Sequence, residues 1–172
     1  MSVATETTAQ QNAQSLTLRD LVKTYSSRGR DAVTAVKGID LDIRPGELVA
    51  LLGPSGCGKT TTLRMIAGLE MPSEGRIEIA GRNVTFLRPR YRNVGMVFQD
   101  YGLYRHMTVF GNIAYPLQVR KLPRAEIAEK VNAVARTMQI VDVLKRKPDQ
   151  LAAGQLQRVA IARMLVRDAD LL

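Results

Sequence analysis

The 172-residue sequence predicts an α/β fold, because a buried strand, a glycine-rich loop and a helix follow one another in its first half. Residues 47–53 (ELVALLG) form a continuous apolar run, which is typical of a strand covered on both faces of a parallel sheet. The loop of residues 53–60 (GPSGCGKT) leads into a helix expected over about residues 59–69. These three elements would open a βαβ unit.

A polar tail and two strands are expected before this unit. Residues 1–14 are rich in Thr and Gln and lack periodicity, which predicts a disordered tail before a folded domain over residues 15–172. Residues 16–43 alternate apolar and polar side chains, as a strand with one buried face does. Residues 26–32 (SSRGRDA) would join two such strands.

Two more strands and a helical lobe are expected after it. Residues 74–81 (EGRIEIAG) predict a strand with its isoleucines inward, and residues 93–98 (NVGMVF) predict another apolar one. Residues 124–138 predict a helix, and a helical lobe would occupy about residues 100–150. The apolar face of that helix would be formed by Ile127, Val131, Val134 and Met138.

Charge and composition narrow the class of protein only a little. The formal net charge of +9 allows an anionic partner, but the longest run of basic residues is 145–147, which favours a scattered, solvated basic surface. No apolar run approaches the roughly 18–20 residues of a membrane span. The single cysteine excludes an internal disulfide, and with no leader-like start we expect a cytosolic location.

The glycine-rich loop carries the clearest chemistry. Residues 53–60 match the pattern G-x-x-x-x-G-K-T between a buried strand and a helix start, where a phosphate site is expected. Gly56 and Gly58 would let the backbone fold tightly and direct N–H groups at phosphates, and the helix dipole would add positive potential. The phosphate-binding residues would be Gly53, Pro54, Ser55, Gly56, Cys57, Gly58, Lys59, Thr60 and Thr61.

Three side chains of this loop have distinct expected roles. Lys59 would reach the β and γ phosphates, the Thr60 hydroxyl would coordinate Mg²⁺, and Thr61 would donate near the α phosphate. An ordinary glycine turn is the alternative, but a turn alone does not explain the lysine between Gly58 and Thr60. Cys57 would contribute only its backbone N–H, since no Cys or His neighbours it in sequence.

Three motifs in this order resemble the ATP-binding subunits of ABC transporters of the importer type, in the subgroup for sugars, polyamines or iron. They are GPSGCGKTTTLRMIAGLEMPSEG, VGMVFQDYGLYRHMTVFGNIAYPL and LAAGQLQRVAIARML. The resemblance covers nearly the whole chain after the tail. It implies a P-loop ATPase cassette with a RecA-like parallel sheet core, an antiparallel β subdomain and a helical lobe. Its cofactors would be ATP and Mg²⁺.

The resemblance adds two site residues. Tyr25 looks like the aromatic residue that stacks on adenine, and an ordinary exposed strand tyrosine is the alternative. Gln99 resembles the glutamine that touches Mg²⁺ and the water and links the core to the helical lobe. A polar residue that merely ends a strand is the alternative for Gln99.

The resemblance also implies partners at the cytoplasmic face of the cell membrane. A second ATP-binding subunit, a pair of transmembrane permease subunits and a solute-binding protein would complete the transporter, and no nucleic acid is expected. Short permease helices would dock on the helical lobe, against Tyr101, Leu103, Tyr104 and Met107, although ordinary lobe packing explains these residues as well. Arg105 stands where relatives often have proline.

One motif departs from the family pattern. The signature loop, usually Leu-Ser-Gly-Gly-Gln, reads here Leu151 followed by Ala152, Ala153, Gly154 and Gln155. Alanine at 152 removes a hydroxyl that would bond the γ phosphate, a loss of about 1.5–3 kcal/mol. Alanine at 153 would cost about 1 kcal/mol if its φ had to be positive.

Other family residues have no counterpart in this sequence. Asp168 and Asp170 precede the final apolar residues rather than follow them, so neither fits the Mg²⁺-binding Asp or the catalytic Glu after it. His106 does not match the family's switch histidine. We therefore expect a cassette incomplete at its C-terminus, with an exposed apolar run at residues 47–53.

Three functions remain open at this point. The first is the ATP-binding part of an importer of a sugar or similar small solute. The second is a shortened module that binds nucleotide without hydrolysing it. The third, a soluble ABC ATPase acting on DNA or ribosomes, draws only on the net charge of +9.

Overall fold

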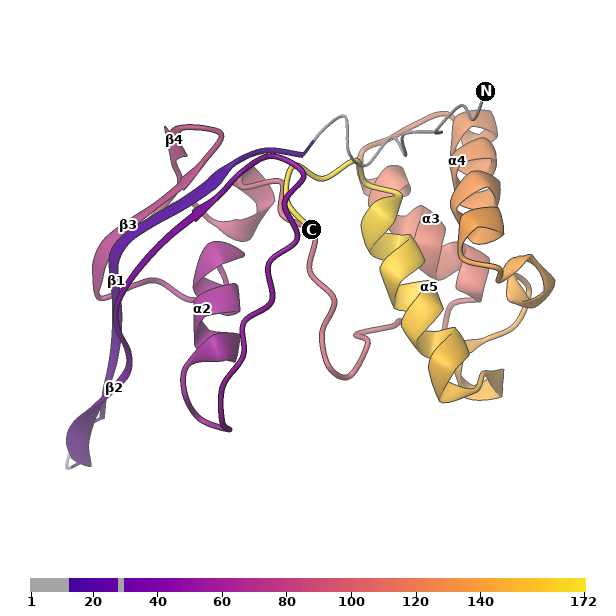
Figure 1. The fold of residues 1–172 in the computed structure, drawn as a ribbon. Helices are drawn as coiled ribbons and strands as arrows, with labels where there is room; N and C mark the ends of the chain where they lie inside the picture. The colour runs from indigo at the N-terminus through magenta and orange to yellow at the C-terminus, as the bar shows by residue number, and fades with distance from the viewer. Residues whose placement is uncertain (1–12, 28–29) are drawn as a thin grey trace, which may run out of the picture. The chain divides into compact units, whose positions relative to one another are not determined.

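A computed structural model describes residues 13–27 and 30–172, and these form two compact units (Figure 1). The first unit extends to Val94 and includes Leu171, and the second comprises Gly95–Asp170 with Leu172. Each unit is described by itself below. The expected disordered tail falls largely on residues 1–12, outside the described residues.

An antiparallel sheet of four strands organises the first unit. Its strands are β1 (Leu16–Ser27), β2 (Arg30–Ile43), β3 (Glu74–Ile79) and β4 (Arg82–Asn83), in the order β2-β1-β3-β4. Leu18 of β1 lies opposite Leu41 on one side and Ile77 on the other, so apolar side chains of three strands meet on one face. This confirms the antiparallel β subdomain and the inward isoleucines of residues 74–81.

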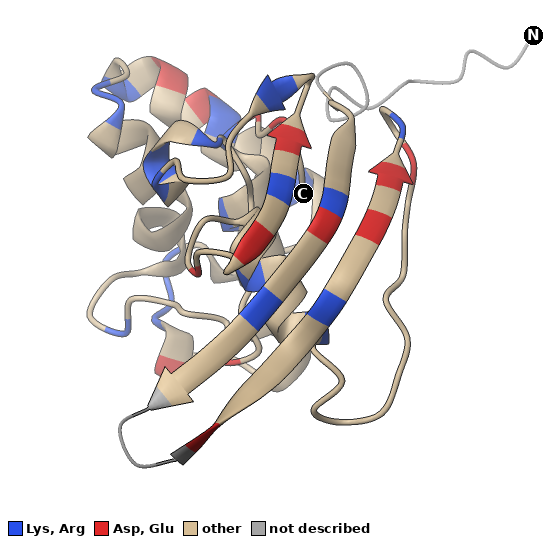
Figure 2. Cartoon of the chain, turned by 90° about the vertical axis from the view of Figure 1, so that its left-hand side faces the viewer, with Lys and Arg blue, Asp and Glu red and all other residues tan. Residues whose placement is uncertain are grey.

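Charged residues recur along the strands of the same sheet (Figure 2). Arg19 of β1 donates to Asp42 of β2 at 2.7 Å, and both side chains are exposed. The hydrogen bond from Arg19 lowers the pKa of the Asp42 carboxyl from its usual value. The sheet therefore has one apolar and one polar face, as its alternating sequence predicts.

One helix, α2 (Lys59–Ile66), packs on the apolar side of the sheet and follows the glycine-rich loop. It ends three residues earlier than expected, because Gly68, which follows the C-cap Ala67, takes a left-handed φ of +75°. The buried core beneath the sheet consists of Leu16, Leu18, Leu21, Val36, Met65, Ile66, Ile77, Ile79 and Val84.

Three helices form the second unit: α3 (Val109–Val119), α4 (Arg124–Thr137) and α5 (Ala153–Leu165). The α4 helix agrees with its predicted bounds to one residue, and Ile127 and Val131 are buried as expected. Val134 and Met138 pack at the edge of the same core. Single turns of 3₁₀ helix occur at Pro89–Tyr91 in the first unit and at Val141–Val143 and Pro148–Gln150 in the second.

Two predicted strands are wrong. Residues 47–53 and 95–98 have no strand structure, and the only parallel pair among the described residues is an isolated bridge between Val94 and Leu171. A strand buried on both faces needs paired neighbours, and no described residue pairs with residues 47–53. Leu48 is 97% exposed and Leu52 90%, which agrees with the expected exposure of this run.

Candidate functional site

The glycine-rich loop turns into α2 at a residue whose conformation and close contacts favour glycine. Gly58 is the N-cap of α2 with φ +92°, a left-handed conformation that other residues adopt at a cost. A Cβ there would clash with the main-chain oxygen of Ala35 and come within 3.1 Å of Val36 Cγ2. The loop therefore lies directly against β2, with no room for a side chain between them.

The start of α2 presents backbone donors that no side chain caps. Gly58 offers no capping group, and the first-turn amides of a helix lack partners within the helix. The main-chain oxygen of Gly58 accepts from Thr62 N at 2.8 Å and from Thr62 Oγ1 at 3.0 Å, which fixes the junction of loop and helix. Free N–H groups, the helix dipole and a fixed loop are the features that favour an anion at a helix start.

The Lys59 ammonium lies against the start of the loop. Its Nζ donates to Gly53 O at 2.8 Å and to Pro54 O at 2.7 Å, and lies 3.4 Å from the Sγ of the exposed Cys57. Neutral carbonyls are weaker acceptors for an ammonium than phosphate oxygens are. The lysine is thus positioned where it can exchange these carbonyls for an anion bound in the loop.

The other loop residues are open to solvent. Ser55, Gly56 and Thr60 are exposed, and Thr61 is half-buried. The described residues contain no cluster of three or more His, Cys, Asp or Glu suited to a metal ion. A single hydroxyl such as that of Thr60 fits Mg²⁺ only when the bound phosphates supply further oxygens, which is the usual way that Mg²⁺ is held beside nucleotides.

Tyr25 lies on the strand pair that supports the loop. It pairs with Val33 of β2, and Lys23, two residues earlier, pairs with Val36, the residue next to Gly58. The Lys23 Nζ lies 4.9 Å from the centre of the Tyr25 ring, and the ring is still 42% exposed. Tyr25 is therefore available to a flat ligand and carries a cation beside its ring.

A groove in the second unit occurs close to the expected docking residues. Its volume is about 370 Å³, and Tyr101 and Leu103 are among the residues that line it. Tyr104 instead packs edge-on against Tyr115, with ring centres 5.0 Å apart. The other lining residues could not be predicted from the sequence, because residues 148–156 approach residues 100–105 only in the folded chain. The full lining is Asp100, Tyr101, Leu103, Arg105, Pro148, Asp149, Leu151 and Leu156.

The loop of residues 151–155 forms the start of α5. Ala152 is its N-cap, and the Gln155 Oε1 accepts from Ala152 N at 3.1 Å. This is one half of a capping box, and the other half is missing because alanine has no oxygen to accept from the first turn. Ala153 opens the helix and is not among the residues with positive φ, so the condition under which this alanine would be strained is not met.

The predicted site residues are divided between the two units. The residues of the glycine-rich loop and Tyr25 belong to the first unit, while Gln99 and the loop of Ala152–Gln155 belong to the second. Gln99 is exposed in a turn, and His106 is exposed as well. No helix in the described part of the chain has the length and apolarity that a membrane crossing requires.

Known proteins resemble the chain over most of its length. The family model described as ABC transporter matches residues 36–172. The chain is 52% identical over 154 residues to the uncharacterized ABC transporter ATP-binding protein YurJ of Bacillus subtilis, covering 90% of the chain and 41% of YurJ. It is 53% identical to the spermidine/putrescine import ATP-binding protein PotA of Acidothermus cellulolyticus, covering 88% of the chain and 39% of PotA. The chain thus spans about two fifths of the length of these relatives.

Solved structures of ABC transporter cassettes are also similar to the chain. The dimeric structure of MJ0796, a bacterial ABC transporter cassette, superimposes with a TM-score of 0.82 at 32% identity, covering 90% of the chain and 70% of that cassette. A post-hydrolysis state of MJ0796 bound to ADP and Pi gives a TM-score of 0.81, again at 32% identity and with the same coverage of both chains.

Proposed function

This chain belongs to the ABC transporter family, and we propose that it binds ATP at the glycine-rich loop of its first unit. The fold class expected from the three motifs is confirmed. The observation that carries the proposal is the junction at Gly58, where the loop is held against β2 and the ammonium of Lys59 lies across its first residues. The ADP and Pi of the similar MJ0796 cassette support it.

Each part of the nucleotide has a proposed partner. The amides of Gly56 to Lys59 and the start of α2 would hold the phosphates, and Lys59 would neutralise the β and γ groups. Thr60 would give a hydroxyl to Mg²⁺, with Gln99 as a further Mg²⁺ and water ligand. Tyr25 would stack on adenine through its exposed face.

We propose that the protein powers solute import as part of a larger assembly. The relatives PotA and MalK are named import ATP-binding proteins, for spermidine/putrescine and trehalose/maltose respectively. The loop of Ala152–Gln155 would face ATP held by a second ATP-binding subunit, and the dimeric MJ0796 structure supports the pairing of two such subunits. Permease subunits and a solute-binding protein would complete the assembly at the cytoplasmic face of the membrane.

The groove of the second unit is the proposed docking site for a permease helix. Leu103, Leu151 and Leu156 contribute apolar side chains to its lining, and Asp100, Arg105 and Asp149 contribute charged ones. An amphipathic helix of the membrane subunits matches this combination, because its apolar stripe can contact the leucines while its polar residues meet the charges. Pairing with these Asp and Arg side chains would fix its orientation.

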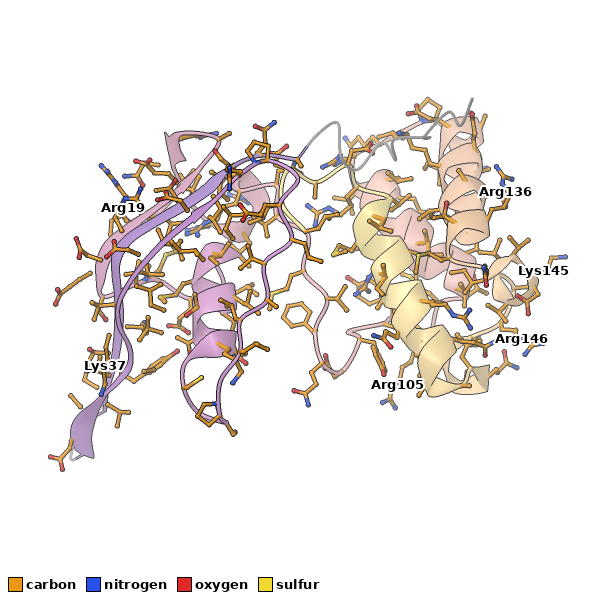
Figure 3. The ribbon with its side chains drawn as sticks, viewed as in Figure 1. Arg19, Lys37, Arg105, Arg136, Lys145 and Arg146 are labelled. Carbon is orange, nitrogen blue, oxygen red and sulfur yellow. The ribbon has the colours of Figure 1, made fainter. Side chains whose placement is uncertain are left out.

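The ATP site is tested by comparing two lysine variants. Lys59→Met removes the ammonium from the loop, whereas Lys37→Met removes an exposed ammonium from β2 that has no ion pair among the described residues (Figure 3). We expect ATP to bind the Lys59 variant about 100-fold more weakly in calorimetry, because about 2.7 kcal/mol of phosphate contact is lost. Equal ATP affinity of the Lys59 and Lys37 variants would contradict the proposal that ATP binds at this loop.

ATP turnover that depends on Lys59 would exclude the alternative of a module that binds nucleotide without hydrolysing it.

A further inference from the structure

The segment that begins the docking groove has a costly backbone conformation. Tyr101 has φ +62° and Gly102 has φ +55°, so two consecutive residues are left-handed, and the first of them is not glycine. Non-glycine residues in this region persist only where the surrounding structure holds them. Three side chains outside the segment contact it, and one of them, Arg163, bonds both left-handed residues.

Arg163 of α5 provides the first set of contacts. Its Nη1 donates to Gly102 O at 2.8 Å and its Nη2 to Tyr101 O at 3.3 Å, so both left-handed residues are bonded to one guanidinium. The same group lies 5.4 Å from the centre of the Tyr104 ring, within cation–π range. Burial lowers the pKa of Arg163, but a guanidinium remains charged at physiological pH.

Asn112 of α3 fixes the other end of the segment. Its side chain is fully buried, and its Oδ1 accepts from Tyr104 N at 2.7 Å while its Nδ2 donates to Tyr104 O at 3.0 Å. Tyr115, also on α3, packs against the Tyr104 ring. The backbone of Tyr104 is thus bonded to Asn112 of α3. Its ring contacts Tyr115 of α3 and Arg163 of α5.

These contacts join the two walls of the groove. One wall is the segment of residues 100–105, and the other consists of Pro148, Asp149, Leu151 and Leu156. Leu156 belongs to α5, the helix that carries Arg163 two turns further on. The guanidinium therefore connects the first wall to the helix that bears the second.

We infer that Arg163 is a positioning residue, which sets the shape of the docking groove by holding Tyr101 and Gly102 to α5. The inference rests on the proposed docking function of the groove. Arginine suits this task because its planar fork reaches two carbonyls and stacks on a ring at once, whereas lysine carries all of its donors on one nitrogen. The segment that follows Gln99 and the loop of residues 151–155 then move as one body when a helix enters the groove.

The test compares three variants of the full-length protein. Arg163→Met removes every contact, Arg163→Lys keeps the charge and one donor, and Arg136→Met removes an exposed charge that projects from α4 (Figure 3). The probe is the purified pair of membrane subunits in nanodiscs, and the dissociation constant for that pair is measured beside the dissociation constant for ATP. Hydrogen exchange of residues 101–107 is followed in the same samples.

We expect Arg163→Met to weaken binding of the membrane subunits at least tenfold and to speed exchange at residues 101–107, with ATP affinity within twofold. Arg163→Lys should fall between wild type and Arg163→Met, and Arg136→Met should match wild type. Unchanged membrane-subunit binding in Arg163→Met overturns the inference, and so does a parallel loss of ATP affinity, which indicates general unfolding. If wild type itself does not bind the membrane subunits, the docking function fails and the inference fails with it.

Discussion

The guanidinium of Arg92 donates to the main-chain oxygen of Met65 at 2.6 Å, at the end of the helix that follows the glycine-rich loop. The same side chain donates to the main-chain oxygens of Ile66, Leu87 and Thr85 and is only 2% exposed. A cation at a helix C-terminus meets the negative end of the dipole and the unpaired carbonyls there. Arg92 therefore anchors the far end of α2 to the segment before Val94.

Replacing Arg92 should destabilise the first unit selectively. We expect Arg92→Met to lower the free energy of unfolding by about 2–4 kcal/mol, because buried helix-end carbonyls lose charged donors. Urea unfolding followed by circular dichroism measures the loss. Arg64→Met is the matched control, since Arg64 is exposed in the last turn of the same helix and should change stability by less than about 0.5 kcal/mol. Similar losses in both variants would contradict the anchoring role.

Two glycine-to-alanine variants should have opposite effects. Gly58→Ala places a Cβ against Ala35 O at a positive φ and should cost about 2–4 kcal/mol. Gly154→Ala meets no atom within 4 Å in α5 and should stabilise that helix by about 0.5–1 kcal/mol. Thermal unfolding of both variants decides the matter, and a stable Gly58→Ala protein would show that the loop is not held against β2.

Ala152→Ser should complete the capping box at the start of α5. A serine oxygen at the N-cap can accept from the first-turn amides while Gln155 continues to bond Ala152 N, so stability should rise by about 0.5–2 kcal/mol. Ala153→Ser is the control, because that residue lies inside the helix. A stability gain for Ala153→Ser alone would argue against the capping explanation.

Tyr25 should contribute to binding of the base but not of the phosphates. Base–aromatic stacking is worth about 1–3 kcal/mol, so Tyr25→Ala should weaken ATP binding about 5- to 150-fold, while Tyr25→Phe should stay close to wild type. Tripolyphosphate, which has no base, should bind all three proteins equally. If tripolyphosphate affinity falls as far as ATP affinity does, Tyr25 supports the loop instead of stacking on adenine.

Local patterns allowed much of the fold to be predicted. The buried faces of β3 and α4 follow from apolar residues that recur about every two residues in the strand and about every 3.6 in the helix. Gly58 and Lys59 stand in a sequence motif whose role in phosphate binding is known from its chemistry. The strand at residues 47–53 was wrong because an apolar run forms a strand only beside paired neighbours. Arg92 and Arg163 were missed because each bonds main-chain oxygens distant in sequence, and such acceptors leave no pattern in the side chains.

The bonds from Lys59 to Gly53 O and Pro54 O also shape the thermodynamics of nucleotide binding. ATP bound at this loop as proposed would not meet a bare ammonium but would have to displace these two internal acceptors. Its affinity would therefore be the difference between two sets of contacts to the same cation. A shorter side chain at residue 59 would weaken both the bonds to these carbonyls and the contacts to phosphate. A change of side-chain length should therefore alter the binding enthalpy more than the binding free energy.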